Sequence, residues 1–170
     1  ASKTILLNDS GTVDIDGNLD VDGGTIKLDG NYPTGTDNVA LGNTALDSVE
    51  AGGTNNVAIG DNAGTAITTG DNNTAVGKDA LTATTTSANN TAIGSCALDA
   101  NTTGSSNTAV GRNSLGANID GIYNSAVGHN SLASNTTADN NTAMGYNALV
   151  ANTTGTRNTA IGGRCSLGAN

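Results

Sequence analysis

The chain has 170 residues, a net charge of −9, no Phe and no Trp. A compact globular core normally uses large aromatic side chains, so this composition argues against an ordinary globular domain. The acidic balance argues against a nucleic-acid partner, because a phosphate-binding surface needs clustered Lys and Arg. Residues 1–50 hold nine carboxylates against Lys3 and Lys27, whereas residues 51–170 carry a net charge of only −2.

Residues 1–37 differ from the rest of the chain and predict an N-terminal β segment with Asp-Gly turns. Apolar residues alternate with Asp over 13–16 and 19–22, and each pattern runs into a turn that contains Gly. Strands of about four residues bury too little surface in one chain, so we expect several chains to pool their apolar faces. The Asp residues of 14–22 invite a calcium interpretation, but their Gly comes too early for an EF-hand loop, and we expect no metal site.

From residue 38 onward the phrase Asn-x-Ala-aliphatic-Gly occurs eight times, with a first spacing of 18 residues and then a constant spacing of 17. A fixed short period indicates a repeat architecture, in which one unit cannot fold alone and a stack can. Disorder is the alternative for so polar a chain, but the aliphatic positions keep strict register. We expect the Asn side chains to form a ladder that satisfies its own amides along the stack. The ladder residues are Asn38, Asn56, Asn73, Asn90, Asn107, Asn124, Asn141 and Asn158.

Each 17-residue unit predicts one coil of a β-solenoid. The phrase itself reads as a short strand, and a Leu four residues after its Gly marks a second short strand. In the second repeat Gly64 replaces this Leu. A strand, a turn, a strand and a turn in each unit predict an all-β fold, in which residues 38–170 form a repeat domain of about eight stacked coils.

The two faces of the first strand carry different residues. The position before the Gly is aliphatic in every repeat, and we expect it to point into the coil. The opposite face is always Ala. Because a solvated position would vary, we expect this methyl group to make a tight contact with another chain. The candidates for this contact between chains are Ala58, Ala75, Ala92, Ala109, Ala126 and Ala143.

The residue after each motif Gly varies freely from repeat to repeat. Solvent exposure alone accounts for such variation, and the alternative is a surface strip for receptor contact. Tyr and Arg are the residues favoured at binding hot spots. The candidate strip residues are Lys78, Arg112, His129 and Tyr146.

No residue pattern predicts catalysis. His129 is the only His, and Ser131 occupies a repeat position where most repeats have Ala, so a Ser-His-Asp site is not indicated. The recurrent glycines serve a bend, and no Cys/His cluster has zinc-ligand spacing. Cys96 and Cys165 lie four coils apart, roughly 19 Å, which is too far for a disulfide within the chain. We therefore expect no enzyme activity, no metal and no cofactor.

The segment Asn55-Asn56-Val57-Ala58-Ile59-Gly60 resembles the head repeat of trimeric autotransporter adhesins of the YadA type. That resemblance implies a left-handed parallel β-roll assembled as an intertwined homotrimer, although the repeats of that family are shorter. The pattern Asn-Thr-Ala-Val-Gly-x-x-Ala-Leu-x-x-Asn-Thr-Thr-Gly is similar to the repeats of phage tail-fibre proteins. Residues 13–23 also look like a stretch that precedes the distal parts of such fibres.

The resemblance implies a structural and adhesive protein: a shaft segment of a homotrimeric phage tail fibre, or of a similar extracellular fibre, that mediates host attachment. The expected location is the virion or the cell surface, and the expected partner is a cell-surface glycan or protein receptor. We expect no membrane insertion, because no apolar run is long enough. One alternative is the head of a bacterial trimeric adhesin that binds a host matrix protein or glycan. An ice-binding solenoid is another, but Ile119 and Asp120 break its column of Thr.

Overall fold

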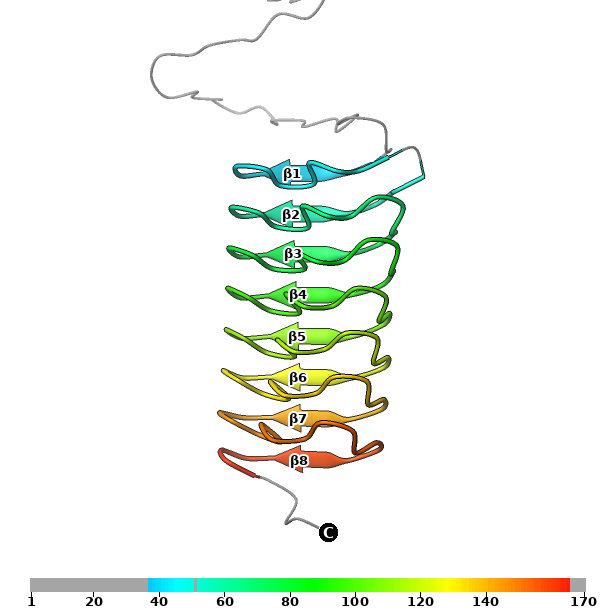
Figure 1. The fold of residues 1–170 in the computed structure, drawn as a ribbon. Coiled ribbons are helices and arrows are strands. Elements are labelled where there is room, and N and C mark those ends of the chain that lie inside the picture. The colour runs from blue at the N-terminus through cyan, green and yellow to red at the C-terminus, as the bar shows by residue number, and fades with distance from the viewer. Residues whose placement is uncertain (1–36, 51, 166–170) are drawn as a thin grey trace, which may run out of the picture.

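The computed structural model describes residues 37–50 and 52–165, and it shows a stack of coils with one short strand in each (Figure 1). The strands form one parallel sheet in chain order, and the described residues contain no helix. The predicted parallel β-solenoid is therefore confirmed, whereas the strands predicted before residue 37 lie outside the described residues. The strands are β1 (Val39–Leu41), β2 (Val57–Ile59), β3 (Thr74–Val76), β4 (Thr91–Ile93), β5 (Thr108–Val110), β6 (Ser125–Val127), β7 (Thr142–Met144) and β8 (Thr159–Ile161).

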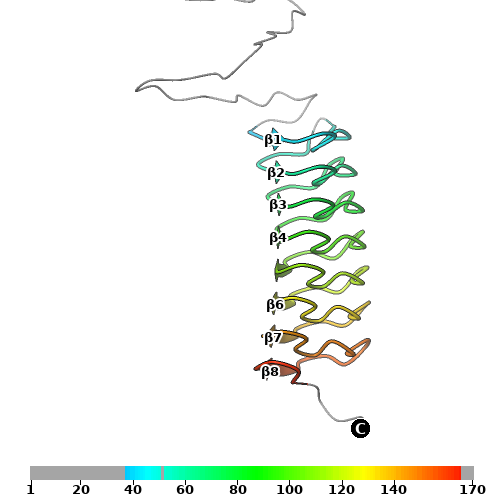
Figure 2. The same cartoon turned by 90° about the vertical axis from the view of Figure 1, so that its left-hand side faces the viewer.

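The sheet forms one wall of the stack and the turns form the opposite wall (Figure 2). From β2 to β8 every residue pairs with the equivalent residue 17 positions further along, as the spacing predicts. The first step is 18 residues long, and its extra residue lies in the turn after β1. The amide of Glu50 donates to the carbonyl of Thr68, 18 residues on, whereas the amide of Thr54 donates to the carboxylate of Asp71, 17 residues on.

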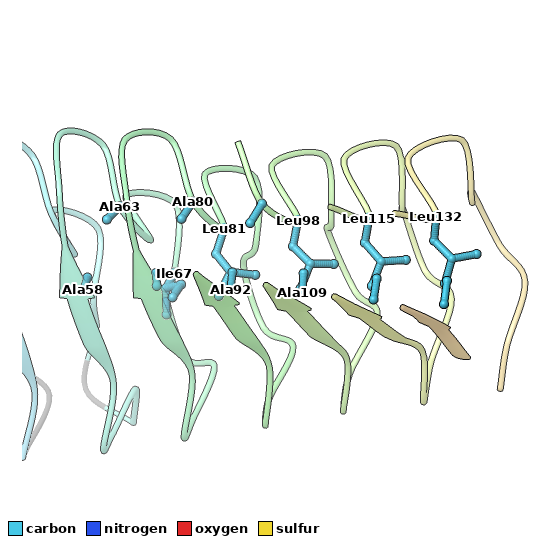
Figure 3. Close-up of a cluster of buried hydrophobic side chains, with 14 of the residues drawn as sticks. Ala58, Ala63, Ile67, Ala80, Leu81, Ala92, Leu98, Ala109, Leu115 and Leu132 are labelled. Atoms are coloured by element: carbon cyan, nitrogen blue, oxygen red, sulfur yellow. The ribbon is translucent and has the colours of Figure 1, made fainter. Parts of the chain in front are cut away.

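The second strand predicted for each coil is absent from the described residues. The Leu residues expected to mark it lie in turns and have left-handed backbone angles, with φ between 49° and 52°. L-residues seldom adopt this conformation, because the Cβ atom approaches the following carbonyl oxygen. An Ala-Leu pair therefore gives no sequence signal for it. The turn directs the Leu side chain inward, where it is buried (Figure 3).

Two apolar ladders line the interior of the coils, one of Ala from the strands and one of Leu from the turns (Figure 3). The six Ala residues proposed for a trimer contact are at most 1% exposed in the single chain. The prediction that they face another chain is therefore wrong, because their methyl groups pack inside their own coils. These residues are Ala58, Ala75, Ala92, Ala109, Ala126 and Ala143.

The aliphatic residue before each motif Gly points outward, which also reverses the prediction. The Leu ladder fills most of the space between the two walls, and close packing leaves room for only a methyl group on the strand side. Leu115, for example, is 0% exposed and lies in the same buried cluster as Ala109. The larger side chain, Val110, is thus left on the outer face.

The second coil keeps the core filled without a Leu. Gly64 occupies the Leu position, and Ile67, three residues later, is fully buried. A Cβ atom added to Gly64 would lie only 2.9 Å from Cδ1 of Ile67 and 3.1 Å from Cδ2 of Leu46. Ile67 therefore takes the space that Leu fills in the other coils. The loss of the Leu side chain at position 64 is thus compensated by the Ile side chain at position 67.

A ladder of buried Asn side chains runs beside the sheet. The Oδ1 atom of Asn90 accepts the amide of Asn107 at 3.0 Å, and its Nδ2 atom donates to the carbonyl of Gly104 at 3.0 Å. The same pair of bonds recurs from Asn38 to Asn141. Each Asn thus closes its own coil and joins it to the next, which satisfies buried backbone groups that water cannot reach.

A second Asn ladder lies in the turns of the later coils. Nδ2 of Asn118 donates to Oδ1 of Asn101 at 2.8 Å, and Nδ2 of Asn135 donates to Oδ1 of Asn118 at 2.9 Å. The same column holds Val49 and Ile67 in the first two coils, where both are buried. The interior of the turn wall therefore changes from apolar to hydrogen-bonded along the stack.

The motif glycines form the bend after each strand. Gly111 has φ +133°, and a Cβ atom there would lie 2.5 Å from the carbonyl oxygen of Gly128. The other glycines of this column have φ between 129° and 141°. An L side chain fits neither the backbone conformation nor the space, so the bend requires Gly.

Candidate functional site

An apolar stripe follows the outer face of the sheet from β1 to β8. It consists of the aliphatic residue that ends each strand, with exposed fractions that reach 40% at Ile93 and 69% at Ile161. With strands about 4.8 Å apart, the stripe is roughly 34 Å long. We call this set the aliphatic stripe: Leu41, Ile59, Val76, Ile93, Val110, Val127, Met144 and Ile161.

The aliphatic stripe has an uncharged row beside it on the same face. The first residue of every strand is Val, Thr or Ser, and none of the residues of β1–β8 carries a charge. Contiguous exposed apolar patches on soluble proteins mark interaction surfaces. The outer face of this sheet therefore has the composition of an interface.

Three of the four predicted strip residues contact one another in consecutive coils, two positions beyond the aliphatic stripe. Nη1 of Arg112 lies 3.3 Å from Nε2 of His129. The ring of His129 stacks on that of Tyr146, with centroids 5.6 Å apart and 18° between the planes. A guanidinium group has no acceptor, so Arg112 donates, and the proton of neutral His129 lies on Nδ1. That atom is buried and has no hydrogen-bond partner among the described residues.

Lys78, the fourth predicted strip residue, lies apart from the other three. Ser95 separates it from Arg112 in the column, and its Nζ atom lies 2.9 Å from Asp61 and 3.2 Å from Asp79. The hydrogen bond that Lys78 donates to Asp61 raises the pKa of Lys78 above 10.5 and lowers the pKa of Asp61 below 3.8. An exposed ion pair of this kind contributes little stability, but it places two carboxylates beside the cation, where they would repel an anionic ligand.

Charge is distributed unevenly along the stack. Residues 37–106 carry seven carboxylates and Lys78 as their only cation, whereas residues 107–165 carry three Arg and two Asp. Among the described residues, the ion pairs between a side-chain cation and a carboxylate are those of Lys78. The later coils are therefore locally basic in an acidic chain, and their guanidinium groups are free of carboxylate partners from the described part.

No family model, no curated protein and no solved structure matches the chain. Within residues 37–50 and 52–165, no three His, Cys, Asp or Glu side chains are placed to hold a metal ion. Cys96 and Cys165 are free thiols. The part of the chain that the structure describes has no long apolar helix of the kind that crosses a membrane.

Sequence reasoning missed the aliphatic stripe as a surface feature. Alternation along a strand separates two faces, but it does not say which face is inside. One signal was available: the residue before the Gly varies among Leu, Ile, Val and Met, whereas the Ala on the other face does not vary. The tighter constraint lies inside, where one added methylene is felt at once.

Proposed function

We propose that the chain is a shaft segment of a homotrimeric extracellular fibre, such as a phage tail fibre, and that the aliphatic stripe forms the interface between its chains. The observation that carries this proposal is the apolar residue at the end of every strand, which is exposed or only half-buried in the single chain. A single chain leaves this row partly in contact with water, although its own interior already buries a continuous apolar cluster.

The free energy available from the stripe is sufficient for association. Complete burial of a Val, Leu or Ile side chain contributes about 1.5–3 kcal/mol. The stripe side chains are already partly covered in the single chain, so about half of that remains for each of them. Summed over eight positions, this amounts to several kcal/mol per chain, before the cost of association.

The shape of the stack supports a fibre rather than a compact oligomer. The coils stack in chain order from β1 to β8 (Figure 1), and each strand ends in a residue of the aliphatic stripe. Three such stripes around a common axis would bury one another along that length, and the turn walls would face outward. An assembly of this kind spans distance and resists bending, which is the work of a shaft.

The test is the mass in solution of the wild-type chain and of one stripe variant, measured by light scattering. We expect wild type at three times 16.5 kDa and Ile93→Asp at 16.5 kDa, because a charge at the interface cannot be solvated there. Thr103→Asp is the matched control, since Asp120 occupies the same turn position in the next coil. A monomeric wild type, or a trimer that survives Ile93→Asp, would refute the proposal.

The two alternatives differ in what supports them. The head of a bacterial trimeric adhesin would use the same stripe, so the stripe does not separate it from a tail fibre. An ice-binding face would need an unbroken Thr ladder in the turns. The column of Thr85 and Thr102 continues with Ile119, which is 46% exposed, and Thr102 donates its hydroxyl hydrogen to the backbone of Ile119. This geometry argues against the ice-binding alternative.

A further inference from the structure

We propose that Arg112, His129 and Tyr146 form a binding strip for a saccharide chain that carries carboxylate groups. This inference goes beyond the proposed shaft function, because it names a class of receptor for the host attachment that the sequence resemblance implies. The first supporting observation is the row of contacts from Arg112 through His129 to Tyr146, which spans three coils. At about 4.8 Å per coil, the row is roughly 10 Å long.

The second observation is an open aromatic face. Tyr146 is 52% exposed, and His129 covers one side of its ring. The next position of the column is Gly163, which has no side chain to cover the other side. Apart from the two residues that flank Gly163, a Cβ atom added there would meet nothing closer than the carbonyl oxygen of Tyr146 at 3.9 Å, so no side chain of another described coil fills this space. A flat ring with one free face is a platform on which the C–H face of a sugar ring can stack.

The third observation is the charge around this platform. Arg112 and Arg164 are exposed, and neither forms an ion pair with a carboxylate of the described residues. Asp120 and Asp139, the carboxylates of residues 107–165, belong to the turn before a strand, whereas the strip lies after the strand. A guanidinium group binds a carboxylate through two parallel hydrogen bonds, which favours an acidic ligand over a neutral one.

The equivalent residues of the earlier coils lack these properties. Lys78 already has carboxylate partners at 2.9 and 3.2 Å, and its neighbours in the column are Asp61 and Ser95. An anionic saccharide would meet negative charge there and no aromatic ring. The strip is therefore confined to the later coils, and it is a local site rather than a property of every repeat.

The binding test uses fluorescence anisotropy of labelled oligogalacturonate, with neutral dextran, dextran sulfate and poly-glutamate as competitors. We expect oligogalacturonate to bind and neutral dextran to compete at least about tenfold less well, since the guanidinium groups select for charge. Equal competition by poly-glutamate or dextran sulfate would show an unselective anion patch, and no binding of oligogalacturonate would show no site. Either result would overturn the proposal.

Three variants locate the site, and two matched variants control for general effects. Tyr146→Ala and Arg112→Gln should each weaken binding about tenfold or more, as truncation of a central aromatic or Arg contact does. Gly163→Val should weaken it similarly by covering the free ring face, with no change in melting temperature. Tyr123→Ala and Arg157→Gln remove an exposed Tyr and an exposed Arg from another column and should leave binding within about twofold.

Equal losses in the strip variants and the matched controls would overturn the assignment. Light scattering on the same samples separates this proposal from the proposed assembly. A monomer that binds through the strip would refute the trimer alone, and a trimer with no binding would refute the strip alone.

Discussion

The inner face of the sheet carries smaller apolar side chains than the outer face, which is the reverse of an ordinary sheet. The inner face holds only the methyl group of Ala, whereas the outer face holds Val, Ile, Leu or Met. In an ordinary sheet the larger apolar side chains face the core, because they gain most from burial. Here the Leu ladder from the turn wall occupies the interior, and the strand wall is left with space for a methyl group. The wall is therefore packed on its inner side, and its outer side is the one that would contact a partner in the proposed assembly.

The largest expected effect comes from the polar part of the inner face. Asn56→Ala removes the acceptor for the amide of Asn73 and the donor to the carbonyl of Gly70, at 2.9 and 2.8 Å. Two buried groups without partners cost about 2–6 kcal/mol together. Denaturant unfolding should show this loss, while Thr103→Ala, at an exposed turn, should change stability little. Similar losses in both variants would mean that the hydrogen bonds of the Asn ladder contribute no more to the free energy of unfolding than an exposed side chain does.

Neighbouring residues on opposite faces should respond differently to the same substitution. Ala109→Leu inserts three carbons into a filled interior and should destabilise the coil by about 1–3 kcal/mol, or more if the stack cannot relax. Val110→Leu adds one methylene to the outer face and should leave the unfolding of the separated chain unchanged. Calorimetry of both variants in the Ile93→Asp background isolates the single chain. A stable Ala109→Leu variant would contradict the inner placement of Ala.

The exchange in the second coil can be tested by a double-mutant cycle. Gly64→Leu alone should clash with Ile67, and Ile67→Thr alone should leave a cavity. The double variant restores the combination of Leu81 and Thr84 found in the next coil, so it should recover much of the lost stability. We expect a favourable coupling of about 0.5–3 kcal/mol between the two sites. Simple additivity would show that Ile67 does not occupy the Leu space.

The smallest expected effect concerns a carboxylate on the turn side. Partial burial raises the pKa of Asp99 above 3.8. The folded state then holds the proton more tightly than the unfolded state, so the contribution of Asp99 to stability falls as the pH rises above 3.8. Asp99→Asn should therefore raise the melting temperature slightly at neutral pH and have no such effect below pH 3.8. An equal gain at both pH values would point to a cause other than ionisation.

The sequence contains much of this architecture, because the repeat forces equivalent residues into columns. The 17-residue coil, the parallel sheet and the column that contains Arg112 all follow from the period. Two features could not be read in the same way. The outward placement of Val110 depends on how much space Leu115 takes from the far wall, and that is a property of the assembled coil. The turn at Leu115 depends on a left-handed backbone conformation, and a Leu in the sequence does not predict that conformation.

Most side-chain bonds between coils join residues 17 positions apart, as between Asn113 and Asn130 or between Asn101 and Asn118. Removal of one whole unit from the regular part of the stack would therefore bring together two coils with the same pattern of Asn, Ala, Gly and Leu. Unequal recombination between such repeats would lengthen or shorten the rod by one coil, and the new neighbours would make the same contacts as the old ones. The length of the rod is thus a trait that can change in steps of about 4.8 Å while the fold stays the same.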